Sequence, residues 1–256
     1  MPALTLETVR PDNLETCGIG CLVNSKNPGY RAKAAWLRDR FAEGLRFLLF
    51  RDDRGKPLAF LEYVPGKFAC RPVDADGWLL VHCLWVYPPG QRIGGLGGRL
   101  IEACLDRARE SRARGVAALV SDGPWMAGKQ IFLKHGFEVV AAVDRFQLIA
   151  HRQRRGHLPR VRDITHRLKD YRGLHVVYAP QCPMLHKSVT DLSQMAGEYG
   201  LTLQVTELHS AREAQEAPSY YGVYSLIWNG RLLSDHYVSK GRFRNILKND
   251  ILKEAR

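Results

Sequence analysis

The residues that decide the fold are Arg92-Ile93-Gly94-Gly95-Leu96-Gly97-Gly98. They follow a nearly continuous apolar run, Trp78–Tyr87, which predicts a strand buried on both faces. They open a segment with helical spacing, Leu96–Arg109. Glycines in such a turn let backbone N–H groups approach an anion, and the helix N-terminus adds a partial positive charge. The stretch therefore predicts a site for a phosphorylated ligand.

Two common phosphate-binding motifs do not fit this stretch. A dinucleotide-binding turn has G-x-G-x-x-G near the start of a βαβ unit, whereas this turn has different spacing and lies in mid-domain after an antiparallel hairpin. A P-loop requires Gly-Lys followed by Ser or Thr, and that sequence is absent from the turn.

The first 150 residues alternate strand-like and helix-like patterns around this turn. Asp52-Asp53-Arg54-Gly55 is typical of a hairpin turn between two short strands. The expected strands are Leu4–Val9, Arg46–Phe50, Leu58–Val64, Trp78–Tyr87, Val116–Ser121 and Val139–Ile149. The expected helices run from Asp12 towards Leu22 and over Tyr30–Gly44, Leu96–Arg109 and Met126–His135.

A second α/β unit is expected after a polar, basic segment. Its strands are predicted over Leu174–Tyr178, Leu201–Leu208, Tyr224–Trp228 and Leu232–Tyr237, with helices over Pro183–Tyr199 and Arg242–Leu252. Asn229-Gly230 is a strong hairpin signal between the last two strands. The sequence thus predicts a domain over residues 1–150, a linker over 151–171 and a smaller domain over 172–256.

The glycine-rich stretch resembles the signature of the GNAT acyltransferases, Arg/Gln-x-x-Gly-x-Gly/Ala, with Arg92 in the first position and Gln91 as the alternative register. Lys134-His135-Gly136-Phe137 is similar to the end of that family's fourth helix. The resemblance implies an α/β fold with a mixed, mainly antiparallel sheet flanked by helices. It also implies acetyl-CoA as the co-substrate.

Further segments resemble acetyltransferases of the YoaP type, which carry a small C-terminal domain after the GNAT domain. These segments are Gly29-Tyr30, Lys33, Trp36-Leu37, Glu43-Gly44-Leu45, Glu62-Tyr63-Val64-Pro65-Gly66 and His82-Cys83-Leu84-Trp85-Val86. The resemblance covers nearly the whole chain. It implies direct transfer of an acetyl group to an amine, with backbone amides near Leu84 and Val86 binding the cofactor alongside residues 92–98.

Acetyl transfer to an amine requires a group that accepts the amine proton. His82 is the candidate base, because it lies on the strand before the turn and its ordinary pKa suits neutral chemistry. The alternative is a buried histidine with local hydrogen bonds. Asp122 and Trp125 are candidates for lining the acceptor pocket, with loop packing as the alternative for Asp122. Phe132 stands where the family usually has a tyrosine that protonates the leaving thiolate.

Cys182 follows a predicted strand and precedes a predicted helix, where a thioredoxin-like domain carries its nucleophile. Leu185 occupies the place of a second cysteine, which excludes a dithiol cycle. A monothiol or redox role for Cys182 competes with a purely structural one.

The net charge of +12 raises the alternative of an RNA-linked amine as acceptor. However, residues 151–172 hold seven arginines and one lysine against two aspartates, and no aromatic residue precedes Tyr171 in this run. We therefore expect a small-molecule amine or amino acid rather than nucleic acid. The cysteine spacing predicts no metal site, and no apolar run reaches the ~20 residues of a membrane span. A cytoplasmic protein is expected, and a homodimer is left open.

Overall fold

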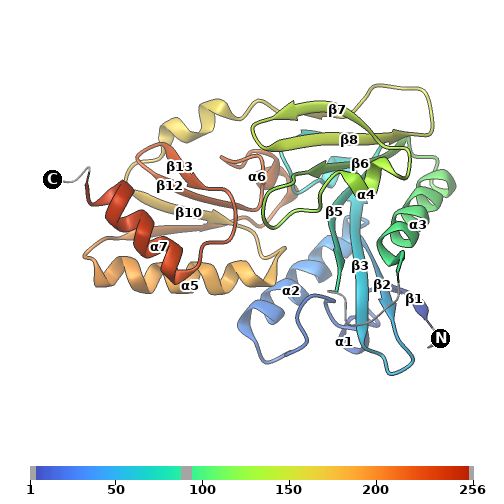
Figure 1. The fold of residues 1–256 in the computed structure, drawn as a ribbon, viewed down its shortest axis with the longest axis horizontal. Coiled ribbons are helices and arrows are strands. Elements are labelled where there is room, and N and C mark those ends of the chain that lie inside the picture. Colours follow the sequence, from blue (N-terminus) through green and yellow to red (C-terminus); the bar gives the residue numbers. More distant parts are fainter. Residues whose placement is uncertain (1–3, 88–93, 254–256) are drawn as a thin grey trace. The chain divides into compact units, whose positions relative to one another are not determined.

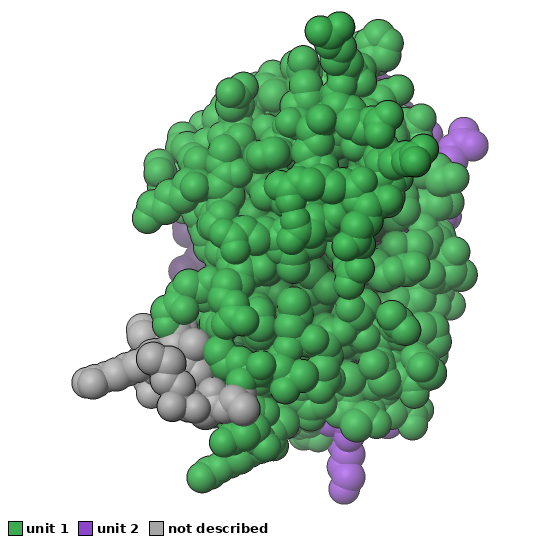
Figure 2. Space-filling model, turned by 90° about the vertical axis from the view of Figure 1, so that its right-hand side faces the viewer, with its two compact units in different colours: residues 1–24, 34–69, 73–162 green, residues 25–33, 70–72, 163–256 purple. Residues whose placement is uncertain are grey.

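The computed structural model describes residues 4–87 and 94–253, so the predicted cofactor residues Arg92 and Ile93 lie outside the described residues. Contacts divide the chain into two compact units, coloured separately in Figure 2. Unit 1 consists of residues 1–24, 34–69 and 73–162, and unit 2 consists of residues 25–33, 70–72 and 163–256.

Unit 1 is built on a seven-stranded sheet (Figure 1). Its neighbouring strands are antiparallel except for one parallel pair, β5 with β6. This confirms the predicted α/β fold with a mixed, mainly antiparallel sheet. In spatial order the strands are β1 (Thr5–Val9), β2 (Arg46–Arg51), β3 (Pro57–Pro65), β5 (Leu79–Val86), β6 (Gly115–Val120), β8 (Phe146–Arg152) and β7 (Glu138–Val143).

The amphipathic helix α3 (Leu96–Glu110) supplies much of the core of unit 1. Its buried side chains Leu100, Ile101 and Cys104 share one apolar cluster with Val81 of β5 and Val116 of β6. The shorter elements are α1 (Leu14–Cys17), η1 (Gly66–Phe68), α4 (Gln130–Leu133) and the two-stranded pair of β4 (Val73–Asp74) with β9 (Arg160–Val161). Helix α2 (Pro28–Ala42) begins among residues assigned to unit 2 and continues into unit 1.

Three expectations for unit 1 are wrong in detail. The helix expected from Asp12 towards Leu22 ends at Cys17, because the next residue, Gly18, leaves the helical conformation with φ 73°. The segment predicted as one strand, Val139–Ile149, forms the hairpin of β7 and β8. Asp144 adopts φ 48° in the turn, a left-handed conformation that aspartate tolerates better than most residues, so no glycine, asparagine or proline marked the turn. The helix predicted over Met126–His135 is confined to α4, because the residues before Gln130 form a loop closed by a hydrogen bond from Ser121 N to Ala127 O (3.4 Å).

Unit 2 contains a four-stranded sheet in the order β11 (Leu203–Glu207), β10 (Leu174–Tyr178), β12 (Tyr224–Trp228) and β13 (Arg231–Ser234). β10 pairs in parallel with β11, and the other pairs are antiparallel. Asn229 (φ 47°) and Gly230 (φ 78°) form the predicted turn between β12 and β13. The helical segments are η2 (Thr165–Asp170), α5 (Pro183–Glu198), α6 (Ala211–Gln215) and α7 (Lys240–Ile246), which continues as η3 (Leu247–Ile251). The thioredoxin-like description of this unit stays a prediction.

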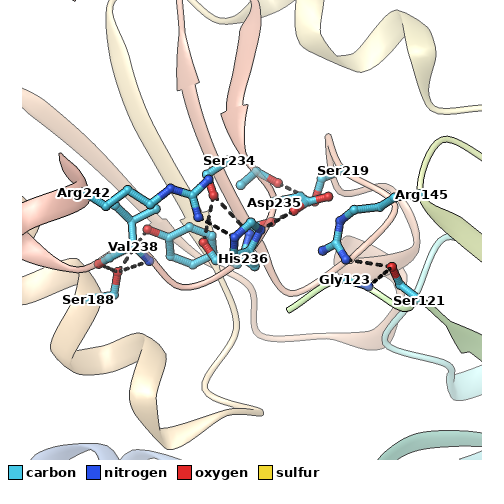
Figure 3. Close-up of polar contacts among 12 residues, drawn as sticks. Ser121, Gly123, Arg145, Ser188, Ser219, Ser234, Asp235, His236, Val238 and Arg242 are labelled. Carbon is cyan, nitrogen blue, oxygen red and sulfur yellow. Dashed lines mark hydrogen bonds and ion pairs between the residues drawn. The ribbon is translucent and has the colours of Figure 1, made fainter. Parts of the chain in front are cut away.

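A buried hydroxyl fixes the loop between β13 and α7 (Figure 3). Ser188 Oγ of α5 donates to Val238 O (2.8 Å) and lies 3.1 Å from the hydroxyl of Tyr224. In the same loop the ring of His236 lies between Asp235, 2.6 Å from Nδ1, and the guanidinium of Arg242. These contacts account for the polar residues inside this part of unit 2.

The basic segment that the sequence predicts as a linker makes ordered contacts with unit 1 in its first half. Trp78 Nε1 donates to His157 O (3.0 Å), and Arg162 pairs with Asp74 (2.5 Å). Part of the positive charge of this segment is therefore neutralised within the fold. Across residues 4–87 and 94–253 the structure contains no helix long and apolar enough to cross a membrane.

Candidate functional site

Strands β5 and β6 separate partway along their length. They pair only from Leu79 with Val116 to Val81 with Ala118. Beyond that point β5 stays paired with β3, with Leu84 opposite Leu61 and Val86 opposite Ala59 in register. Among the described residues, no strand pairs with Cys83–Val86 on the side of β6. Leu84 and Val86, the residues predicted to hold the cofactor, lie on this part of the strand, where an extended ligand could pair with their backbone groups.

A bulge explains why β5 diverges here. In the pairing of β3 with β5, Glu62 is opposite Cys83 and Tyr63 is opposite Val81, so His82 is the extra residue. Such a bulge bends the strand and increases its local twist. The departure of β5 from β6 begins at this residue, and we call the space between the two strands the slot.

His82 lies beside a buried carboxylate. Its Nδ1 is 3.3 Å from Glu62 Oε1, and neither side chain has any exposed surface. Leu61 and Tyr63 belong to the core that α3 covers, so Glu62 between them faces the opposite side of the sheet. The ring of Trp36 from α2 lies on that side, 6.3 Å from the ring of His82. The structure thus places the candidate base where β5 leaves β6, with the carboxylate of Glu62 close to its imidazole.

The glycines at the start of α3 fall into two groups. Gly95 has φ +80°, and a Cβ on Gly94 or Gly95 would meet no described atom within 4 Å. A Cβ on Gly97 would stand 2.6 Å from Ile131 Cδ1, and one on Gly98 would stand 2.7 Å from His135 Nε2. A side chain at either of the first pair would thus meet none of the described atoms, and a helix N-terminus of this kind favours binding of a diphosphate. The second pair lets α4 and the residues after it pack closely on α3.

The end of β5 leads into this helix turn. A Cβ on Gly97 would lie 3.3 Å from Val86 Cγ2, so the outer end of the strand and the first turn of α3 are in close proximity. Leu96 is buried at the same turn and anchors the helix in the core. The outer end of β5 and the first turn of α3 therefore lie side by side.

Phe132 does not line an exposed site. Only 1% of its surface is exposed, and its ring packs edge-on against Phe137 with a centroid distance of 5.3 Å. The nearby His135 is partly exposed, and its Nδ1 is 3.6 Å from Glu102 Oε1. Phe132 is thus a core residue, and it cannot supply a proton.

A polar pocket of about 170 Å³ lies at the carboxyl end of β6. Its lining residues are Val120, Ser121, Asp122, Gly123, Lys129, Arg145 and Gln147. Asp122 was singled out from the sequence, whereas Trp125 is not among the lining residues. Trp125 is 43% exposed and adopts φ 69°. Arg145 was missed because its hairpin was read as a single strand.

Cys182 is the N-cap residue of α5 in unit 2 and is partly buried. The preceding Gln181 accepts hydrogen bonds from both terminal nitrogens of Arg71 (3.2 and 3.3 Å). Leu185, one turn into the helix, is buried. Within the described residues no group of three or more His, Cys, Asp or Glu side chains is arranged to hold a metal ion.

Comparisons with known proteins find similarities to acetyltransferases. In solved structures, the chain is similar to the PaiA N-acetyltransferase of Thermoplasma acidophilum in complex with coenzyme A (12% identity, TM-score 0.44, 59% of this chain and 99% of that one). It is also similar to a GNAT-family acetyltransferase of Brucella melitensis in complex with acetyl-CoA (18% identity, TM-score 0.40, 61% and 93%).

A family model described as YoaP-like matches residues 203–245. The uncharacterized N-acetyltransferase YoaP of Bacillus subtilis is 27% identical over 248 residues, which cover 93% of this chain and 96% of that protein. The predicted resemblance is thereby confirmed: the chain is similar to a YoaP-type N-acetyltransferase along nearly its whole length.

Proposed function

We propose that this protein is an acetyl-CoA-dependent N-acetyltransferase that acts on a small-molecule amine. The observation that carries the proposal is that the outer end of β5, which no described strand pairs on the side of β6, lies beside the first turn of α3. An extended chain of amides ending in a diphosphate fits this arrangement, because a strand edge offers hydrogen bonds and a helix N-terminus attracts anions. The similarity to YoaP, which is named an N-acetyltransferase, supports the same assignment.

The proposed cofactor residues are Leu84 and Val86 on the strand and residues 92–98 in the turn. Acetyl-CoA supplies an acetyl thioester whose carbonyl carbon bonds to the amine nitrogen while its sulfur leaves as the thiolate. Backbone N–H groups on the edge of β5 would stabilise the negative charge that develops on the carbonyl oxygen. Gly97 and Gly98 contribute indirectly, by allowing the close packing that fixes the turn.

His82 is the proposed base. Because its side chain has no exposed surface, it can accept a proton only from a group that enters the slot. Glu62 would act as a positioning residue that orients the ring and stabilises the imidazolium. With Phe132 in the core, the thiolate leaves without a proton from that position.

A matched pair of variants at Gly95 tests the proposal. Asparagine and aspartate both tolerate the left-handed conformation and have the same shape, so they differ mainly in charge. We expect Gly95→Asp to weaken acetyl-CoA binding at least tenfold more than Gly95→Asn, measured by calorimetry. Equal affinities would contradict a diphosphate at this turn. Release of free CoA with a panel of amines then tests the transfer reaction.

The proposal also assigns the chemistry to one of the two domains. Acetyl transfer is assigned to the domain of residues 1–150, and the domain of residues 172–256, including Cys182, takes no part in the chemistry. Unchanged turnover in Cys182→Ser would support this assignment. Loss of turnover with intact acetyl-CoA binding would instead give that thiol a direct role.

A further inference from the structure

We propose that Trp85 of β5 and Trp125 of the loop after β6 form an apolar subsite for the acetyl acceptor, and that the acceptor is therefore an amine bearing an aromatic or large apolar group. This inference rests on the proposed function. It adds a subsite and a substrate class that neither the slot nor the cofactor turn specifies.

The register of β5 with β3 assigns the side chains at its outer end to two faces of the sheet. Leu84 is opposite Leu61, and both belong to the apolar core that α3 covers. Because side chains alternate along a strand, the next residue, Trp85, points to the other face. Glu62, which lies beside His82, points to that same face, since it follows Leu61 on β3. The candidate base and Trp85 therefore share one face of the sheet.

Exposure increases along this face towards the end of β5. The side chain of His82 has no exposed surface, Cys83 is partly buried, and Trp85 is 48% exposed. On the β3 side the neighbour of Trp85 is the buried Phe60, against which the segment at Gly20 packs so closely that a Cβ there would stand 2.8 Å from Phe60 Cδ1. On the other side no described strand pairs with this part of β5. A substituent of the amine can therefore contact the indole of Trp85 from the slot.

A second exposed tryptophan lies at the same edge of the sheet. β5 and β6 run parallel, so their carboxyl ends lie at one edge, and Trp125 follows Val120, the last residue of β6, by five positions. Trp125 is 43% exposed although its φ of 69° is unfavourable for a bulky side chain. Strained residues of this kind cluster at binding and active sites. Among the described residues Trp85 and Trp125 are the two exposed tryptophans, and both follow the point at which β5 and β6 separate.

The spacing along β5 indicates the size of the amine. His82 and Trp85 are three residues apart, so at a strand rise of about 3.3 Å per residue their Cα atoms are at most roughly 10 Å apart. An amine nitrogen at His82 therefore reaches the indole through a substituent several bonds long, such as the side chain of phenethylamine or of phenylalanine. Indole rings bind aromatic and aliphatic groups through their large apolar surface. A small polar amine would leave that surface in water.

The test compares matched acceptors in which a phenyl group is replaced by a hydroxyl group. The full chain is assayed for CoA release with phenethylamine and ethanolamine, and with L-phenylalanine and L-serine. In each pair that is acetylated, we expect the aromatic member to have a kcat/KM about tenfold to a hundredfold higher, the range expected for burying a phenyl group.

Matched variants then assign the preference to the two indoles. Trp85→Ala should bring the ratio of kcat/KM values close to one, whereas Trp85→Phe should keep most of it because an aromatic ring remains. Trp125→Gly should also lower the ratio, and glycine adopts a φ of 69° without strain, so the loop can keep its conformation. Leu6→Ala, at an exposed side chain of β1 on the far edge of the sheet, is the control and should leave the ratio unchanged.

Acetyl-CoA binding, followed as a thermal shift, separates the inference from the proposed function. A normal shift with neither aromatic acceptor acetylated, with no aromatic preference, or with an unchanged preference in Trp85→Ala overturns this inference and leaves the proposed function standing. Absence of the shift overturns the proposed function itself. Sedimentation shows whether a second copy of the chain covers Trp85 instead, and a dimer that Trp85→Ala dissociates would also overturn the inference. If Trp85→Ala fails to fold, Trp125→Gly answers the same question.

Discussion

The imidazole of His135 lies directly over Gly98, so that a Cβ at Gly98 would stand 2.7 Å from His135 Nε2. The ring is oriented by Glu102, whose carboxylate lies one turn further along α3 and 3.6 Å from Nδ1. Gly98 is therefore a packing residue, in contrast with Gly94 and Gly95, which face open space among the described residues. This distinction gives the glycine-rich turn two separable functions.

Gly98→Ala should stabilise the protein less than a glycine-to-alanine change in a helix ordinarily does, because the imidazole must move away from Glu102 to make room. Alanine in a helix interior is favoured over glycine by about 0.5–1 kcal/mol, and moving the end of a partly exposed side chain offsets part of that gain. In the His135→Ala background the same change should give the full gain, since the space is then clear. Additive effects in this double-mutant cycle would contradict the close contact. Gly94→Ala is the control and should melt close to the wild type.

The pair of His82 and Glu62 predicts a specific kinetic pattern. His82→Gln should lower kcat about 10²- to 10⁴-fold without changing the affinity for acetyl-CoA, because it removes a base and not a cofactor contact. Glu62→Gln should lower kcat less and should alter the pH profile, because it removes the charge beside the ring. Initial-rate assays measure kcat and its pH profile, and calorimetry measures the affinity for acetyl-CoA. Unchanged turnover in His82→Gln would exclude His82 as the base.

Phe132→Tyr tests whether a tyrosine at this position can protonate the leaving thiolate. The ring is 1% exposed and packs against Phe137, so a hydroxyl there would be buried without a partner. We expect a loss of about 1–3 kcal/mol in stability and no gain in kcat. A faster reaction would show that the edge of this ring reaches the thioester, contrary to the packing described above.

Stability should fall in alkaline solution. Burial and the hydrogen bond to Glu7 (2.9 Å) raise the pKa of Cys17 from 9.0 to about 11. Burial raises the pKa values of Tyr63, Tyr87 and Tyr224 from 10.0 to about 12. All four groups have a higher pKa folded than unfolded, so their contribution is complete below pH 9 and is lost as the pH rises towards 12.

Melting curves between pH 7 and about pH 11 measure this loss. In Cys17→Ala the decline should be shallower but should still begin near pH 9, because burial also raises the pKa of Cys104 from 9.0. A melting temperature that stays constant through this range would contradict the assigned environments.

Local sequence signals predicted much of the fold. The hairpin of β2 and β3, the helix α3 and the Asn229-Gly230 turn each follow from periodicity or turn chemistry within a short window. The hairpin of β7 and β8 was missed because Asp144 supports its turn without glycine or proline. A contact between segments far apart in the sequence, such as that of Arg71 with Gln181, cannot be predicted from a short stretch of sequence.

The candidate site could likewise be predicted from the sequence only in part. The sequence placed His82, Leu84 and Val86 on one strand, but the bulge that separates β5 from β6 depends on register with β3. The pairing of His82 with Glu62 and the grouping of Arg145 with Ser121 likewise arise from cross-strand and loop geometry. The sequence alone predicts a turn for the cofactor, whereas these groupings of side chains required the three-dimensional arrangement.

The most direct test of the central claim is calorimetric titration of the full chain with acetyl-CoA, repeated for Gly95→Asn and Gly95→Asp. The proposed site predicts saturable binding, a melting temperature that rises with ligand concentration, and a much weaker affinity for the aspartate variant than for the asparagine variant. Absence of binding to the wild-type protein, or equal affinities for the two variants, would contradict an acetyl-CoA site at the start of α3.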